Sequence, residues 1–312
     1  MSAPMSAPVS APVSPLAQAP RSAKSIGAIL VESGQLDEAG VERVLGFQRQ
    51  ENLRFGEAAM RLGLISESDI QFALSRQFAY AYVRKSSDGT HSLNEELVAA
   101  YEPFSARTEA IRAIRSQLML RWFDKHKGHQ VLAVVGAERG EGRTYLAANL
   151  AVVFAQLGER TLLIDGDMRT PRQQFLFRLE NRMGFSTLLA GRSRDDVIVR
   201  IPELSGLSVL PAGPTPPNPL ELLNRLNFDE LLIHVRSAFD VIIVDTPAMA
   251  IGEDAAMISV RAGAALVVAR SGTTRASAFS DLALGLQDAG AQVVGSVLND
   301  VPRTRKERRK ST

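Results

Sequence analysis

Between residues 131 and 298, short apolar runs alternate with longer segments in which apolar residues recur at helical spacing. Each run is four to six residues long, the usual length of a buried strand, and the helical segments include 106–122 and 146–157. This alternation predicts an α/β fold in which a parallel sheet carries helices on both faces. The predicted strands are 131–135, 161–164, 207–210, 241–244, 265–269 and 293–298.

Residues 25–78 contain an internal repeat, whose two copies are offset by 29 residues. In each copy, apolar residues at helical spacing surround a Gly-x-Leu or Gly-x-Ile turn. Asp37 and Ser66 stand where the N-caps of the second helices belong, and the pattern predicts a module of two helix-turn-helix copies. The matching positions are Ile26-Gly27, Gly34, Leu36, Val41, Leu45 and Gln48 in one copy and Phe55-Gly56, Gly63, Ile65, Ile70, Leu74 and Gln77 in the other.

The remaining segments differ from these two units in composition. Residues 1–24 are rich in Ala, Pro and Ser, lack the regions of a signal peptide and predict a disordered tail. Residues 79–104 are expected to form a polar linker, which places the sheet domain at 105–302. The last segment, 303–312, holds six basic residues and one glutamate, so the rest of the chain is net acidic although the whole carries +2. Positive charge is not spread along a folded face, so we expect no nucleic-acid partner.

Composition excludes several classes of site. The chain has no cysteine, which rules out disulfides and thiolate metal sites, and its four histidines lack metal-ligand spacing. No apolar stretch reaches the roughly 18 residues that a membrane helix needs. We therefore expect a soluble cytoplasmic protein.

The segment 134–145 follows a predicted strand and opens a predicted helix, as a phosphate-binding loop does. Its pattern resembles a Walker A motif with Gly136 and Gly142 as the two glycines, Arg143 in place of the usual lysine, and Thr144 as the hydroxyl for Mg²⁺. Glycines let backbone N–H groups turn toward phosphate oxygens, and the new helix adds the positive end of its dipole. The alternative is a glycine-rich turn without a ligand.

Aspartates end two of the predicted strands. Asp165 and Asp167 follow the run 161–164, and Asp245 follows 241–244, as the aspartate of a Walker B motif does. Because the carboxyl ends of parallel strands line the ligand crevice, these carboxylates are expected beside the phosphate loop. There they could hold Mg²⁺. The alternative is that they are helix caps or turn formers.

These motifs resemble those of the bacterial protein-tyrosine kinases, a family that shares ancestry with the MinD and ParA ATPases. Residues 165–169 resemble its Walker A′ motif, and Glu109-x₂-Arg112-x₂-Arg115 resembles the motif that packs neighbouring subunits into a ring. Residues 216–223 and 245–247 are also similar. The resemblance covers about 105–302 and implies a P-loop NTPase fold and an ATP-dependent tyrosine kinase. It points to the branch that controls exopolysaccharide chain length, whose membrane activator is often a separate protein.

The resemblance also implies a role for each matching residue. Asp165 would act as the base or metal-orienting carboxylate for a tyrosine hydroxyl, with Asp167 and Arg143 as further catalytic residues. Thr144, Asp165 and Asp245 would hold Mg²⁺, and Asn299 would contact adenine. Glu109, Arg112 and Arg115 would join subunits of a homo-oligomer, or Glu109 and Arg112 would form only an i,i+3 pair. The residues expected to bind the nucleotide are Gly136, Gly140, Glu141, Gly142, Arg143, Thr144, Tyr145 and Asn299.

The sequence departs from the family pattern in two respects. Arg143 keeps the positive charge of the usual lysine but presents a planar fork, so we expect nucleotide binding to persist with altered geometry. No tyrosine follows the predicted sheet, where these kinases usually carry a tyrosine cluster. Tyr80 and Tyr82, beside the linker, are the alternative acceptors, although core packing is an equally simple use of both. The basic tail would face anionic lipid at the inner membrane, or be merely solvated.

Two competing functions stay open: a MinD/ParA-like ATPase switch, and a non-catalytic nucleotide sensor that couples the repeat module to a membrane polysaccharide complex. The repeat module itself resembles the N-terminal module of type II secretion and type IV pilus ATPases. Some of those modules bind cyclic di-GMP through a motif that begins Arg-Leu-Gly. Here the second copy has Arg54-Phe55-Gly56 and the first has Ser25 in place of arginine, so a protein-docking or packing role is the alternative.

Overall fold

A computed structural model describes residues 24–77, 83, 92–192 and 197–300 and divides the chain into two units, Met1–Phe78 and Ala79–Thr312. The two tails predicted from the sequence, and Tyr80 and Tyr82, lie outside the described residues except for Lys24. In the part of the chain that is described, no helix is both long enough and apolar enough to cross a membrane.

Within residues 24–77, the first unit contains four helices, α1 (Ile26–Glu32), α2 (Glu38–Glu51), α3 (Phe55–Arg61) and α4 (Glu67–Gln77). The side chain of Asp37 caps α2 by accepting a hydrogen bond from the Gly40 N–H group at 2.7 Å. Ser66 accepts one from the Asp69 N–H group at 3.3 Å at the start of α4. Both predicted N-caps are therefore confirmed.

The two copies of the repeat interlock. The short helix of each copy packs against the long helix of the other, α1 against α4 and α2 against α3. One copy alone would leave its apolar face in water, so the pair is the smallest unit with a closed core. That core contains Ile29, Leu30, Leu36, Val44, Ala58, Ala59, Ile65 and Ala73.

The second unit is built on a seven-stranded sheet in the order β3-β4-β2-β5-β1-β6-β7. Six of its strands are parallel and correspond to the six predicted runs, while β3 pairs antiparallel with β4 at one edge. The sequence gives no sign of β3, because it has two residues and both are exposed. The bounds are β1 Val131–Gly136, β2 Thr161–Asp165, β3 Val199–Arg200, β4 Leu207–Leu210, β5 Val241–Asp245, β6 Ala264–Arg270 and β7 Gln292–Asn299.

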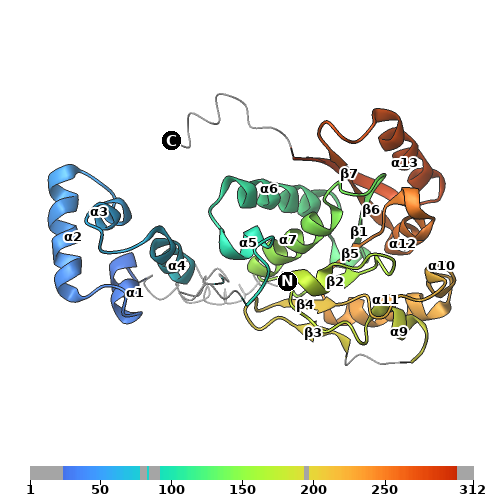
Figure 1. The fold of residues 1–312 in the computed structure, drawn as a ribbon, viewed down its shortest axis with the longest axis horizontal. Helices are drawn as coiled ribbons and strands as arrows, with labels where there is room; N and C mark the ends of the chain where they lie inside the picture. The colour runs from blue at the N-terminus through green and yellow to red at the C-terminus, as the bar shows by residue number, and fades with distance from the viewer. Residues whose placement is uncertain (1–23, 78–82, 84–91, 193–196, 301–312) are drawn as a thin grey trace, which may run out of the picture. The chain divides into compact units, whose positions relative to one another are not determined.

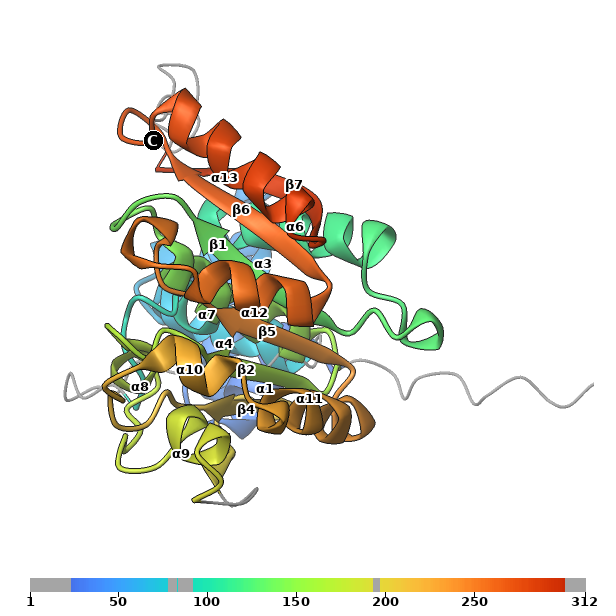
Figure 2. The ribbon, with the colours of Figure 1, turned by 90° about the vertical axis from the view of Figure 1, so that its right-hand side faces the viewer.

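Helices cover both faces of this sheet, as expected. One apolar core lies beneath α5 (Val98–Tyr101), α6 (Ala106–Arg121), α7 (Arg143–Gln156) and α8 (Gln173–Leu176). The other lies beneath α9 (Phe185–Leu189), α10 (Pro219–Leu223), α11 (Leu226–Ala238), α12 (Asp254–Ala262) and α13 (Ala276–Asp288). Figure 1 shows α6 and α7 on one side of the strands, and Figure 2 shows α11, α12 and α13 in front of them.

The helix α7 lies nearest the centre of the domain, and its polar residues organise the chain before α6. Asn149 accepts a hydrogen bond from the Ala99 N–H group at 2.9 Å, and Gln156 donates to the Ala99 carbonyl at 2.8 Å. Tyr101 is buried, and its hydroxyl donates to the carbonyl of Leu93 at 2.8 Å. Val83, Leu93 and residues 97–101 all belong to this core, so the expected linker 79–104 is too long at its C-terminal end. The apolar run 97–101 is too short to show periodicity, which is why the pattern missed it.

Candidate active site

The segment 136–145 runs from the end of β1 into the first turn of α7 and carries the phosphate-loop motif predicted from the sequence. Gly142 is the N-cap of α7 and has φ of 95°, in the left-handed region that favours glycine. The first N–H groups of a helix have no partner within it, so the start of α7 can bind an anion. Five residues separate Gly136 from Gly142, so the Walker A spacing of four residues begins at Ala137 and not at Gly136 as expected.

Arg143, which replaces the usual lysine, turns its side chain back onto the loop. Its Nη1 donates to the Glu138 carbonyl at 2.6 Å, and its Nε donates to the Thr246 carbonyl at 3.2 Å. The residue is only 8% exposed. The guanidinium thus lies at the loop, where it donates hydrogen bonds to main-chain carbonyls.

Two other residues expected to bind the nucleotide use their side chains differently. Glu141 is fully buried, and its carboxylate accepts a hydrogen bond from the Thr274 hydroxyl at 2.6 Å. A carboxylate repels phosphate, so Glu141 can offer phosphate only its main chain. Tyr145 is half-buried, packs against the core beneath α7, and has its pKa raised by that burial.

Asn299, at the end of β7, contacts the loop itself. Its Nδ2 donates to the Glu141 carbonyl at 2.9 Å. The side chain therefore supports the loop backbone in this structure, and a contact with adenine stays a proposal.

The two strand-end carboxylates lie side by side, because β2 and β5 are neighbours and Asp165 is in register with Asp245. Both residues are fully buried. Asp165 accepts hydrogen bonds from the N–H groups of Gln173 at 2.9 Å, Arg172 at 3.2 Å and Asp167 at 3.2 Å. It therefore holds the segment 166–173 against the end of the sheet.

Burial dominates the electrostatics of this pair. It raises the pKa of Asp165 well above the usual range, and the neighbouring Asp245 carboxylate raises it further. Burial also raises the pKa of Asp245 to about 6, although hydrogen bonds from Thr144 and Gln173 and the charge of Arg143 lower it. Two desolvated carboxylates side by side favour an added cation.

The chemistry of these groups fits Mg²⁺. The Thr144 side chain lies near enough to Asp245 to lower its pKa, so a hydroxyl and a carboxylate come together at the start of α7. Within the described residues, Oδ1 of Asp245 is buried without a hydrogen-bond partner. The same residues include no group of three or more His, Asp or Glu side chains able to hold a metal. Mg²⁺ commonly takes one or two carboxylates and completes its shell with phosphate and water.

Asp167 has a structural role that the sequence left open as an alternative. Its Oδ1 accepts from the Thr170 N–H group at 2.8 Å, and its Oδ2 accepts from the Thr170 hydroxyl at 2.8 Å. Arg169, in the same segment, pairs with the buried Asp254 of α12 at 3.0 Å. The carboxylate of Asp167 thus forms a turn, and a catalytic role for it stays a proposal.

Gln173 belongs to the site although no sequence motif indicates it. The residue is fully buried, and its Nε2 donates to Asp245 Oδ2 at 2.9 Å and to the Thr144 carbonyl at 3.2 Å. One amide thus links the segment 166–173, the end of β5 and the start of α7. A lone glutamine in the four-residue helix α8 has no spacing that could have revealed this.

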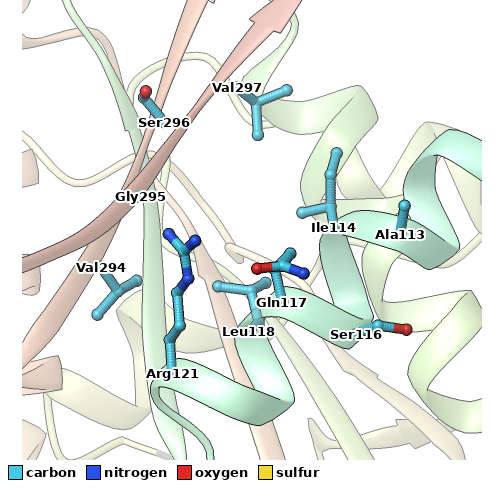
Figure 3. Close-up of a pocket in the computed structure, with 10 residues that line it drawn as sticks. All are labelled: Ala113, Ile114, Ser116, Gln117, Leu118, Arg121, Val294, Gly295, Ser296 and Val297. Atoms are coloured by element: carbon cyan, nitrogen blue, oxygen red, sulfur yellow. The ribbon is translucent and has the colours of Figure 1, made fainter.

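The three residues of the predicted subunit motif lie on α6 and belong to a different surface. Glu109 is exposed and pairs with Arg112 at 3.6 Å, the i,i+3 pair left open by the sequence. Arg115 donates to the Val153 carbonyl of α7 at 2.8 Å. The same helix forms one wall of a cavity of about 430 Å³ against β7. Figure 3 shows Ile114, Leu118 and Arg121 on that wall, opposite Val294 and Val297.

Comparison with known proteins places this site in a family. Residues 129–284 match the family described as "Cellulose biosynthesis protein BcsQ". The chain is 33% identical to tyrosine-protein kinase YwqD of Bacillus subtilis over 207 residues, which cover 66% of this chain and 86% of YwqD. The chain belongs to the bacterial tyrosine-protein kinase family.

Further members of this kinase family show how far the likeness extends. The chain is 34% identical to tyrosine-protein kinase etk of Escherichia coli K12 over 208 residues, 67% of this chain but only 28% of etk. The solved kinase domain of Escherichia coli ETK superimposes with a TM-score of 0.64 at 34% identity, covering 67% of this chain and 81% of that domain. The chain therefore has the P-loop NTPase fold of the kinase domain and spans less than a third of the length of etk.

Proposed function

We propose that the chain is an ATP-dependent protein-tyrosine kinase. The observation that carries this is the buried pair Asp165 and Asp245, which lies against the Thr144 hydroxyl at the start of α7. Two desolvated carboxylates beside a helix N-terminus suit a magnesium–triphosphate complex better than any structural purpose, because their mutual repulsion costs stability.

The residues divide the chemistry among them. The N–H groups at the start of α7, with Gly140 and Gly142 shaping the loop, would hold phosphate, and Thr144 and Asp245 would hold Mg²⁺, with Asp165 next to it. Bound Mg²⁺ supplies positive charge against phosphate oxygens. Asp165 would accept the proton of a tyrosine hydroxyl, and its raised pKa makes it a better proton acceptor than an ordinary aspartate.

The tyrosines of the described residues are poor acceptors. Tyr101 is buried and hydrogen-bonded to Leu93, and Tyr145 is packed against the core. The accepting hydroxyl would therefore come from Tyr80, Tyr82 or another protein molecule.

The deciding experiment is incubation of the full chain with Mg·ATP, followed by mapping of phosphotyrosine by mass spectrometry. A kinase gives phosphotyrosine on the chain or on an added tyrosine polymer, and Asp165→Asn abolishes it. Asp281→Asn is the matched control, because Asp281 is an exposed aspartate of α13. Phosphotyrosine that persists at the wild-type level in Asp165→Asn would contradict the assignment.

The two competing functions predict other outcomes of the same assay. An ATPase switch of the MinD/ParA kind releases ADP without phosphotyrosine. A non-catalytic nucleotide sensor gives neither product but still binds ATP. The burial of Tyr101 and the core packing of Tyr145 favour these alternatives, so both products should be measured together.

We place the kinase in exopolysaccharide biosynthesis and chain-length control, with a membrane co-polymerase protein as activator. Support comes from the names of similar proteins, which include a kinase "in cps region" and a cellulose biosynthesis family. Deleting 303–312 should weaken binding to anionic liposomes at low salt if the basic tail recruits the chain to the inner membrane. Equal binding of both forms would count against that recruitment.

A homo-oligomer joined through Glu109, Arg112 and Arg115 is the accompanying proposal. Glu109 is the best probe because its side chain is 64% exposed. Glu109→Ala should shift the sedimentation profile toward the monomer, with Glu230→Ala of α11 as a control for loss of an exposed glutamate. An unchanged profile would remove Glu109 from the interface.

Cyclic di-GMP is a separate proposal for the first unit, and only the Arg54-Phe55-Gly56 resemblance supports it. Ser25 and Arg54 occupy equivalent positions, as N-caps of α1 and α3. Calorimetry with cyclic di-GMP should register heat that Arg54→Ala removes. Absence of heat for the wild type would leave the module a packing or protein-docking unit.

A further inference from the structure

The starting point is the buried carboxylate inside the phosphate loop. Glu141 has no exposed surface, its Oε1 accepts from the Thr274 hydroxyl at 2.6 Å, and its Oε2 lies 3.6 Å from Arg143 Nη1. Within the described residues, Oε2 has no hydrogen-bond partner. A buried charge needs compensation, and Arg143 is the cation that the structure places beside it.

Gly136 leaves room for this pair. A Cβ at this position would lie 2.3 Å from Glu141 Oε2 and 3.0 Å from Arg143 Nη1. No real side chain tolerates the first distance, so only glycine at the end of β1 allows the carboxylate and the guanidinium to meet there. The Glu141–Arg143 pair therefore depends on glycine at position 136.

Arg143 is held by oxygen acceptors, namely the carbonyls of Glu138 and Thr246 and the Glu141 carboxylate. Its positive charge is thereby shared with acceptors inside the loop. A lone cation beside phosphate would attract it strongly in a partly buried site. A cation that already has a carboxylate partner attracts phosphate much less.

Glu141 is anchored from the opposite direction, so it cannot follow Arg143 toward solvent. The Thr274 hydroxyl that donates to Glu141 also accepts from the Arg270 N–H group at 2.8 Å, which fixes it between β6 and α13. The Glu141 carboxylate therefore stays in place whether or not Arg143 leaves it.

We propose that Glu141 is an internal competitor of nucleotide phosphate for Arg143, and that this competition sets the nucleotide affinity of the loop. The proposal rests on the proposed function, since it concerns the same nucleotide site. Phosphate binding must draw Arg143 away from Glu141 and leave that carboxylate without its cation. Glu141 is thus a positioning residue that acts through Arg143.

The test measures Kd for Mg·ATP by calorimetry on folded, full-length variants. Glu141→Gln should bind about tenfold more tightly than the wild type, equivalent to about 1.4 kcal/mol. Glu138→Gln is the matched control, because it removes a carboxylate of the same loop that pairs with Arg275 instead. It should change Kd less than about threefold, as expected for an exposed pair.

Further variants test whether the effect of Glu141 acts through Arg143. In an Arg143→Ala background, Glu141→Gln should no longer tighten binding, because the cation it releases is missing. Thr274→Val removes the hydroxyl that shares the Glu141 charge, so it should strengthen the pairing with Arg143 and weaken nucleotide binding, while Thr274→Ser restores it. The two Thr274 variants also decide the matter if Glu141→Gln does not fold.

The outcomes separate this proposal from the proposed function. If the wild type binds Mg·ATP and Glu141→Gln binds equally or more weakly, the competition is refuted and the kinase proposal stands. A gain that persists in the Arg143→Ala background also refutes it, since Glu141 would then act on phosphate directly. Failure of the folded wild type to bind nucleotide at millimolar concentration would overturn both.

Discussion

Asp240 directly precedes β5 and Asp245 ends it, and the two carboxylates differ in burial and in the groups that surround them. Asp240 accepts two hydrogen bonds from the Arg160 guanidinium, at 2.7 and 2.8 Å, one from the Arg160 N–H group at 3.2 Å and one from Lys125 at 2.8 Å. These bonds hold its pKa below the usual range. Asp245 is fully buried, and its pKa is raised to about 6. One aspartate is stabilised by its neighbours and the other is destabilised by its surroundings.

The difference distinguishes the amino ends of the strands, which serve the fold, from their carboxyl ends, which form the proposed active site. At the amino end of β5, Asp240 is paired with Arg160 and Lys125, so its charge is balanced without a ligand. At the carboxyl edge, Asp165 and Asp245 share a desolvated site whose charge is not balanced. Such imbalance costs folding stability and is expected where a ligand completes the site.

The largest expected effect is at Asp165. Asp165→Asn should lower the rate of phosphotyrosine formation by about 10³-fold, within the usual contribution of a general base. The ligand-free protein should keep its fold, because the removal of one of two repelling buried charges offsets the loss of hydrogen bonds that a single amide oxygen cannot accept. Rates come from phosphotyrosine appearance and stability from thermal denaturation. A variant that loses activity and also melts earlier would indicate a structural role instead.

The second effect is a pH dependence that has opposite sign at the two ends of β5. Because the folded pKa of Asp245 lies above its unfolded value, its protonation favours the folded state, and stability falls as pH rises from about 4 to 6. A shift of about two units corresponds to about 3 kcal/mol. Because the pKa of Asp240 is lowered, its contribution is instead lost as pH falls below about 4.

The difference in unfolding free energy between the wild type and a variant isolates the pH dependence that one aspartate contributes. Urea denaturation of the metal-free protein at pH 4 and pH 6.5 should show that Asp245→Asn gains stability relative to the wild type only at the higher pH. An equal difference in unfolding free energy between Asp245→Asn and the wild type at both pH values would contradict this prediction.

A smaller effect is expected at Gln173, which links the end of β5 to the start of α7. Gln173→Leu removes the hydrogen bonds to Asp245 and the Thr144 carbonyl, and should lower kcat/KM for ATP by about tenfold, as outer-shell partners of metal ligands typically do. Gln174→Leu, the adjacent buried glutamine, is the control. Equal losses in both variants would point to general damage to α8.

The smallest effect is at Asp240. Asp240→Ala should cost roughly 1 kcal/mol of unfolding free energy, because its partners are half-exposed and solvent screens the pairs. The loss should shrink in high salt, while Kd for Mg·ATP stays unchanged. A change in nucleotide affinity would show that the amino end of β5 also contributes to the nucleotide site.

The sequence predicted those features that depend on local pattern. Buried parallel strands are continuous apolar runs, so all six were found, and Asp37 and Ser66 were found as caps because a cap needs only its own helix. The strand β3 and the core segment near Leu93 were missed because both are too short to carry a period. Gln173 was missed because its partners are 29 and 72 residues away.

By itself, the chain determined which acids end the strands and where the phosphate loop stands, since strand length and turn chemistry are properties of neighbouring residues. Only the tertiary structure decided where each side chain points. It turned Glu141 inward to Thr274 and brought Asp165 beside Asp245. The reason is that burial and charge pairing depend on strand order and on packing between distant segments, which no local pattern encodes.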